Sequence, residues 1–183
     1  MLTHLHVEPV SPDLIPSAGR FAGTFLGGFQ TMRLHGPCKL IRLIENSRFR
    51  QDRPGDYWME ANTFFQARLT AARDLAAQHV EVGKRPALAG LIVRFILRDQ
   101  LAVCRDWSGL DSFIALDLPP GMSLLVLIGN AKMQPYYSTQ DPGHAGAETA
   151  GVRLPGLGVQ IVIDFQLPDN RPAASLVSQP MPF

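Results

Sequence analysis

The clearest hydrophobic pattern in the chain is the alternation in CKLIRLIE, residues 38–45. Successive side chains of an extended chain point to opposite faces, so this alternation predicts a β-strand. Arg42 falls on the same face as Leu40 and Ile44, and Glu45 falls on the other. A charge among large apolar neighbours is costly unless it is paired or bound. Arg42 is therefore either an ion-pair partner or solvent-facing residue, or a guanidinium at the base of a ligand cleft.

Two helices are predicted in the middle of the chain by apolar positions that recur every three or four residues. Asn62 is a suitable N-cap for a helix over 63–80, and a second helix is expected after Pro86. The apolar faces predicted for the two helices are Phe65, Leu69, Ala72 and Ala76 in the first, and Leu88, Leu91, Ile92, Phe95 and Ile96 in the second.

Short apolar runs predict three further strands at 112–117, 123–128 and 159–165. A long segment of small and turn-forming residues separates the last two, and loops of that length are usually functional or disordered. Residues 21–34 are apolar but interrupted by three glycines. Their pattern fits a short helix or a glycine-interrupted strand equally well.

The order of these elements, strand then helices then several strands, indicates an α+β protein rather than alternating βαβ units. We expect a single α+β domain over residues 21–167, because 183 residues suffice for one core. Proline-rich segments at both ends predict an irregular arm over 1–20 and an irregular tail over 168–183. No apolar run reaches the ~18 residues of a spanning helix, and the N-terminus lacks a signal-peptide pattern, so we expect no membrane association.

Composition narrows the function classes only slightly. The formal charge of +1 gives no net field toward nucleic acid or anionic lipid. Arginine makes up 14 of the 17 basic residues, which reflects either genome composition or recognition of phosphate and carboxylate groups. Two cysteines favour a reducing compartment, and scattered histidines predict no metal site. Neither a Rossmann fingerprint nor a P-loop is present.

Three further candidates for ligand contact stand out beside Arg42. Tyr57 and Trp58 follow a Pro-Gly-Asp turn and would either fill the core or stack on a ligand ring. Gln134 lies in the polar segment GNAKMQPYYS, whose composition fits a ligand-contacting loop or a wet surface. Gln160 follows the turn Pro-Gly-Leu-Gly, and it belongs either to a half-exposed edge strand or to a strand that the two glycines expose to a ligand.

Four segments between about residues 38 and 165 occur in a familiar order: KLIRLIE, PGDYWM, RDQLAVCRDWSG, and LIGNAKMQ followed by RLPGLGVQIVI. This series resembles the toxin domains at the C-termini of bacterial Rhs and PAAR-associated polymorphic toxins. Their layout is in turn similar to the ADP-ribosyltransferase fold. The resemblance implies mixed β-sheets with flanking helices and NAD as a substrate, without a metal.

Carried over residue by residue, the resemblance implies specific roles. Arg42 would match the first-strand position, Trp58 a ring-packing position and Gln160 the late-strand position. On this hypothesis Arg42 and Gln160 would be catalytic, and NAD would be bound by Arg42 and Trp58 together with Tyr57 and Gln134. Transferases of this kind carry Gln-x-Glu on the late strand, whereas this chain reads Gln-Ile-Val from Gln160. Either Gln160 replaces the acid, or Asp164, Glu148 or Asp141 supplies it, or the domain lacks this chemistry.

The resemblance predicts a toxin- or effector-like domain that acts as an ADP-ribosyltransferase or an NAD glycohydrolase. A cognate immunity or antitoxin protein would be its partner, and its acceptor is not specified. The protein would act in the cytoplasm, or in a target-cell cytoplasm after delivery by a secretion system. Two alternatives remain: a non-enzymatic binding module or degenerate relative in such a system, and a metal-independent RNase-type toxin.

Overall fold

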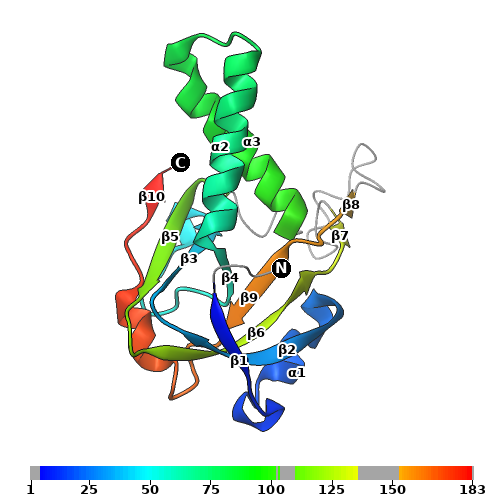
Figure 1. Ribbon diagram of the computed structural model, residues 1–183, viewed down its shortest axis with the longest axis vertical. Helices are drawn as coiled ribbons and strands as arrows, with labels where there is room; N and C mark the ends of the chain where they lie inside the picture. The colour runs from blue at the N-terminus through cyan, green and yellow to red at the C-terminus, as the bar shows by residue number, and fades with distance from the viewer. Residues whose placement is uncertain (1–4, 102, 104–109, 136–152, 183) are drawn as a thin grey trace.

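The computed structural model describes residues 5–101, 103, 110–135 and 153–182. Within these ranges the chain forms a strongly curved eight-stranded sheet with a long helical hairpin at one end and a short helix at the other (Figure 1). The observed class is therefore α+β, as the order of elements predicts.

The strands are β1 (His6–Pro9), β2 (Phe25–His35), β3 (Cys38–Ile44), β4 (Tyr57–Glu60), β5 (Ser112–Leu118), β6 (Ser123–Ala131), β7 (Gln134–Pro135), β8 (Arg153–Leu154), β9 (Val159–Ile163) and β10 (Met181–Pro182). The helices are α1 (Ala18–Phe21), α2 (Ala61–Ala77) and α3 (Arg85–Leu101). Short 3-10 segments are η1 (Pro12–Leu14), η2 (Ala22–Thr24), η3 (Asn46–Arg48), η4 (Val82–Lys84) and η6 (Arg171–Leu176).

The strand order in the main sheet is β1-β2-β6-β9-β4-β3-β5-β10, and β7 pairs with β8 separately. All pairings between described strands are antiparallel, so the expected mixed sheets are not observed. The four-residue strand β4 joins the β1-β2-β6-β9 half to the β3-β5-β10 half. Strands far apart in sequence, β3 and β9, thus flank the same short strand.

Alternation along the strands divides the apolar side chains between two faces of the sheet. Leu40, Trp58 and Ile161 belong to the core enclosed by the curved sheet. The opposite face packs under α2 and α3 at one end and under α1 at the other. Ile41 contributes to the helix-covered side, which confirms the two-faced pattern predicted for residues 38–45.

The helix predicted over 63–80 occupies residues 61–77, and its buried face differs from the predicted one. Glu60 rather than Asn62 is the N-cap residue, and its side chain makes no capping hydrogen bond. The buried side chains are Ala61, Phe64, Ala67, Ala71 and Leu75. Phe65 and Leu69 are 48% and 43% exposed, because the sheet meets the face that carries Phe64.

The second helix begins at Arg85, with Pro86 in its first turn, where a missing N–H is harmless. Its fully buried apolar residues are Val93 and Leu97, whereas the predicted face residues Leu91 and Phe95 are exposed. Several sides of each helix are apolar, so periodicity alone identified the helices but not the faces that pack.

Both chain ends are more ordered than the sequence pattern predicts. The expected irregular arm contains β1, which pairs with β2 from His6 opposite His35. The expected irregular tail contains η6 and β10, and Ala173 is fully buried in the core. Residues 21–34, left open between helix and strand, form η2 and most of β2, with a register shift at the Gly27–Gly28 pair.

Candidate functional site

A cavity of about 340 Å³ lies where β3 and β9 separate on either side of β4. β3 pairs with β4 only at Leu40 and Ile41, so the rest of β3 has no partner on that side. β4 in turn pairs with β9 only through Tyr57 and Trp58. The short pairing opens the sheet, and side chains from both of its halves line the opening.

All five residues that the sequence singled out line this cavity, namely Arg42, Tyr57, Trp58, Gln134 and Gln160. The other lining residues are Thr24, Leu43, Ile44, Glu45, Arg48, Phe49, Arg50, Arg53, Pro54, Met59, Leu101, Val103 and Lys132. Residues separated by more than a hundred positions in the chain therefore meet in one space.

Arg42 is held over a backbone turn rather than by an ion pair. A Cβ at Gly55 would collide with the guanidinium, and Gly55 has φ of +87°. Arg42 Nη1 donates to the Tyr57 carbonyl at 3.3 Å, while Nε is buried and has no hydrogen-bond partner among the described residues. Burial lowers the pKa of Arg42, and the nearby Asp56 carboxylate opposes that shift. The guanidinium thus lines the cavity while its Nε is shielded from solvent.

The two aromatic residues of β4 have different environments. Trp58 is 1% exposed, packs edge-on against Phe165 and donates from Nε1 to the Gly55 carbonyl at 3.0 Å. Its indole is a core element, with little surface left for stacking on a ligand. Tyr57 is 39% exposed and makes an edge contact with Phe21. Burial raises the pKa of Tyr57, and a hydrogen bond with Thr24 partly offsets this.

Gln160 lies on a central strand rather than at a half-exposed edge. β9 pairs with β6 on one side and β4 on the other, and Gln160 is only 5% exposed. Its Nε2 donates to the Thr24 carbonyl at 3.0 Å and lies 3.5 Å from Thr24 Oγ1. Its Oε1 accepts no hydrogen bond from the described residues, so the amide has an acceptor to offer at the cavity wall.

The glycines before β9 admit the end of α3, not a ligand as one interpretation of the sequence held. Gly156 N–H donates to the Asp99 carbonyl at 2.9 Å, and Gly158 N–H donates to the Gln100 carbonyl at 2.8 Å. A Cβ at Gly158 would approach the Gln100 carbonyl oxygen to 2.7 Å. The turn therefore caps the last carbonyls of α3 and fixes the start of β9.

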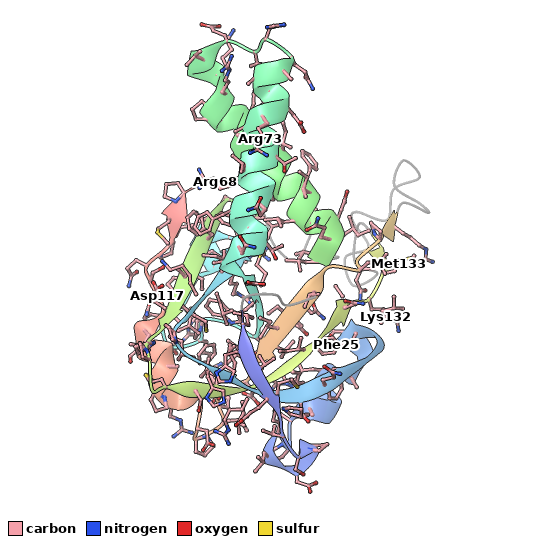
Figure 2. The ribbon with its side chains drawn as sticks, in the orientation of Figure 1. Phe25, Arg68, Arg73, Asp117, Lys132 and Met133 are labelled. Carbon is pink, nitrogen blue, oxygen red and sulfur yellow. The ribbon has the colours of Figure 1, made fainter. Side chains whose placement is uncertain are left out.

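The described part of the cavity wall is strongly basic. Arg42, Arg48, Arg50, Arg53 and Lys132 line it, against a single described carboxylate, Glu45. The three loop arginines follow β3, and Lys132 directly follows β6, on the side of the molecule labelled in Figure 2. Five positive charges in one concave site favour a ligand with phosphate or carboxylate groups.

None of the three carboxylates that the sequence offered in place of the missing acid is found at the described cavity wall. Asp164 is buried and accepts a hydrogen bond from Gln166 N–H, but it does not line the cavity. Asp141 and Glu148 lie outside the described residues, as do Tyr136 and Tyr137 of the segment that holds Gln134. Within the described ranges, no three His, Cys, Asp or Glu side chains gather as a metal site.

Sequence reasoning missed Thr24, Glu45 and Lys132 as cavity residues. Thr24 touches both Gln160 and Tyr57, and it follows a segment with no distinctive pattern. Glu45 was visible as the polar end of the alternating strand, but only the separation of β3 from β4 brings it to the cavity.

Comparison of the chain with protein-family models, curated proteins and solved structures finds no match. In the part of the chain that the structure describes, no helix has both the length and the apolar content to cross a membrane.

Proposed function

We propose that the chain is an NAD-consuming enzyme of ADP-ribosyltransferase or NAD glycohydrolase type. The observation that carries the proposal is that Arg42, Tyr57, Trp58, Gln134 and Gln160 line one cavity. The resemblance to polymorphic-toxin domains matched Arg42, Trp58 and Gln160, and residue type and local context selected Tyr57 and Gln134. A basic concave site with one exposed aromatic ring and an amide is also suited to a dinucleotide.

In this proposal the pyrophosphate lies against the Arg42 guanidinium, which lines the cavity. The nicotinamide ring lies near Tyr57, since Trp58 is sealed in the core. Gln160 Oε1 accepts a hydrogen bond from a ribose hydroxyl, and Gln134 contacts the ligand at the cavity wall. These contacts would act mainly by positioning and charge stabilisation.

The proposed reaction breaks the bond between C1′ of the ribose and N1 of nicotinamide. The bonding electron pair leaves with nicotinamide, which becomes neutral, and C1′ becomes an oxocarbenium-like centre. Water or an acceptor nucleophile adds to C1′ and loses a proton. With water, NAD yields ADP-ribose, nicotinamide and a proton.

The test is to incubate the purified protein with NAD at millimolar concentration and to measure free nicotinamide by chromatography. We expect turnover by the wild type and a loss of about 100-fold in Arg42→Ala. Arg73→Ala is the matched control, because Arg73 lies exposed on α2 in the helical hairpin (Figure 2). Absence of turnover together with absence of NAD binding by calorimetry would overturn the proposal.

The second candidate is a binding module that holds the same ligand without cleaving it. It is favoured by the amide at Gln160, where related enzymes would need a carboxylate. NAD binding that is lost in Arg42→Ala, with no nicotinamide released, would support this candidate instead.

A role as a delivered toxin with a cognate immunity protein is part of the proposal and is supported by the sequence resemblance. Expression in a bacterial cytoplasm should slow growth and lower cellular NAD in the wild type. The same expression of Arg42→Ala should do neither.

A further inference from the structure

The cavity contains one described acidic side chain whose role the proposed function leaves open. Glu45 lines the cavity together with five basic residues. Such a residue could simply neutralise the loop arginines, or it could face a positively charged part of the ligand. The position of Glu45 on the sheet distinguishes these roles.

Glu45 lies on the same sheet face as Tyr57 and Gln160, whereas Arg42 lies on the opposite face of β3. Its backbone is extended, with φ of −97° and ψ of 117°, and continues the alternation of β3 from Ile41. Ile41 is paired with Met59, which alternates with Tyr57, and Gln160 shares the Tyr57 face of β9. Paired residues project to one face, so Glu45, Tyr57 and Gln160 lie on the same side of the separated strands.

The Glu45 carboxylate is held in place at the cavity wall. Arg48 Nε lies 3.4 Å from Glu45 Oε1, and Ser47 Oγ donates to the same oxygen at 2.9 Å. The side chain is 24% exposed, which is less than half the exposure of Arg48. Both partners belong to the segment that follows β3, so they fix the position of the Glu45 carboxylate.

The other described carboxylates near β3 and β9 do not line the cavity. Asp56 lies 3.4 Å from Arg20, and Asp52 forms a two-point contact with Arg50. Glu60 is 8% exposed at the start of α2 and does not line the cavity. Among described residues, Glu45 is thus the acid that the cavity itself presents.

We propose that Glu45 is a catalytic residue, supplying the carboxylate that the late strand lacks. This rests on the proposed function. As nicotinamide departs with the bonding electron pair, positive charge develops at C1′, and a carboxylate stabilises it far better than the neutral amide of Gln160. Glu45 also accepts a hydrogen bond from a ribose hydroxyl, while Gln160 holds the ribose from β9. The carboxylate is therefore supplied from the end of β3 instead of from β9, the strand that carries Gln160.

The test compares nicotinamide release by wild type, Glu45→Gln and Glu81→Gln. Glu81 is the matched control, because it forms the same i,i+3 ion pair, with Lys84, at the tip of the hairpin. We expect Glu45→Gln to lower kcat about 100-fold with KM changed less than about threefold, and Glu81→Gln to match the wild type. Glu45→Asp should retain intermediate activity, and formate should partly restore Glu45→Ala.

The outcomes separate the two proposals. A wild type without turnover overturns the proposed function and this inference with it. An active wild type whose Glu45→Gln variant retains kcat overturns only the inference. If Glu45→Gln melts well below the wild type, then formate rescue of Glu45→Ala decides: recovered turnover supports the catalytic role, and no recovery overturns it.

Discussion

Two buried amides, Asn170 and Gln160, show how this fold distinguishes a structural polar group from one in a site. Asn170 is completely buried, and its side chain makes three hydrogen bonds to backbone groups. Its Oδ1 accepts from Leu125 N–H at 2.8 Å, and its Nδ2 donates to the carbonyls of Leu125 and Asp164 at 2.8 and 3.1 Å. The amide thus joins the tail to β6 with little capacity left over.

Gln160 is almost as buried but only partly satisfied. Its Nε2 is anchored to Thr24, while Oε1 has no donor among the described residues. An acceptor that no protein group satisfies is available to water or to a ligand. The two amides therefore differ in how far described protein groups satisfy them, and Gln160 is the one that lines the cavity.

The largest effect on stability is expected for Asn170→Ala. The change leaves one N–H and two carbonyls buried without partners, which should cost about 3 kcal/mol of unfolding free energy. Urea denaturation measures this loss, with the exposed Asn62→Ala as the control. Folded Asn170→Ala should still bind ADP-ribose as the wild type does; a loss of binding without a loss of stability would contradict the comparison.

Gly55→Ala should affect both stability and the site. Its positive φ costs roughly 1–2 kcal/mol for an L-residue, and the new Cβ would also collide with the Arg42 guanidinium. Gly121→Ala is a matched control, because Gly121 has φ of +83° but open space around its Cβ. By calorimetry, only Gly55→Ala should weaken ADP-ribose binding, by about tenfold; equal binding by the two variants would exclude Arg42 from the ligand site.

Gln160→Leu should have the opposite profile to Asn170→Ala: a small loss of stability and a clear loss of ADP-ribose binding. Only the hydrogen bond to Thr24 is lost, so the unfolding free energy should fall by about 1 kcal/mol. Binding of ADP-ribose should nevertheless weaken about tenfold, because the ribose loses its acceptor. Thermal melts and calorimetry on the same preparations measure both quantities. If the affinity for ADP-ribose is unchanged, then Gln160 has a structural role, like Asn170.

The smallest effect is expected for Asp56→Asn and concerns pH. Burial raises the pKa of the Asp56 carboxyl, and Arg20 and Arg42 partly oppose this. Because the folded-state pKa lies above the unfolded value, the stabilising contribution is present at low pH and is lost as pH rises through the folded-state pKa. Melting temperatures recorded upward from about pH 4 should therefore fall less in Asp56→Asn than in the wild type. A steeper fall in the variant would contradict the assignment.

Much of the fold was predictable, because hydrophobic periodicity is local. The alternation at residues 38–45 gave β3 its two faces, and the runs at 112–117 and 123–128 became β5 and β6. The faces of α2 were not predictable in the same way. Phe65 is as apolar as Phe64, and only the docking of Phe64 against Phe113 decides which of them is buried.

In the candidate site, too, some features could be predicted from the sequence and others depended on the packing. Arg42, Tyr57, Trp58, Gln134 and Gln160 could be selected from the sequence, and they do line one cavity. Their individual environments could not be foreseen: Trp58 is part of the core, whereas Tyr57 faces outward. The glycines before β9 suggested an approaching ligand, but the group that approaches is the end of α3.

The sequence by itself determined the strands β3, β5, β6 and β9 and the helices α2 and α3, and it showed which polar residues interrupt apolar runs. Tertiary structure alone decided that β4 is too short to hold β3 and β9 together, and so placed Glu45, Thr24 and Lys132 around one cavity. The physical reason is the range of the interactions. Periodicity and turn chemistry act over a few residues, whereas strand pairing and helix docking join segments that lie far apart in the chain.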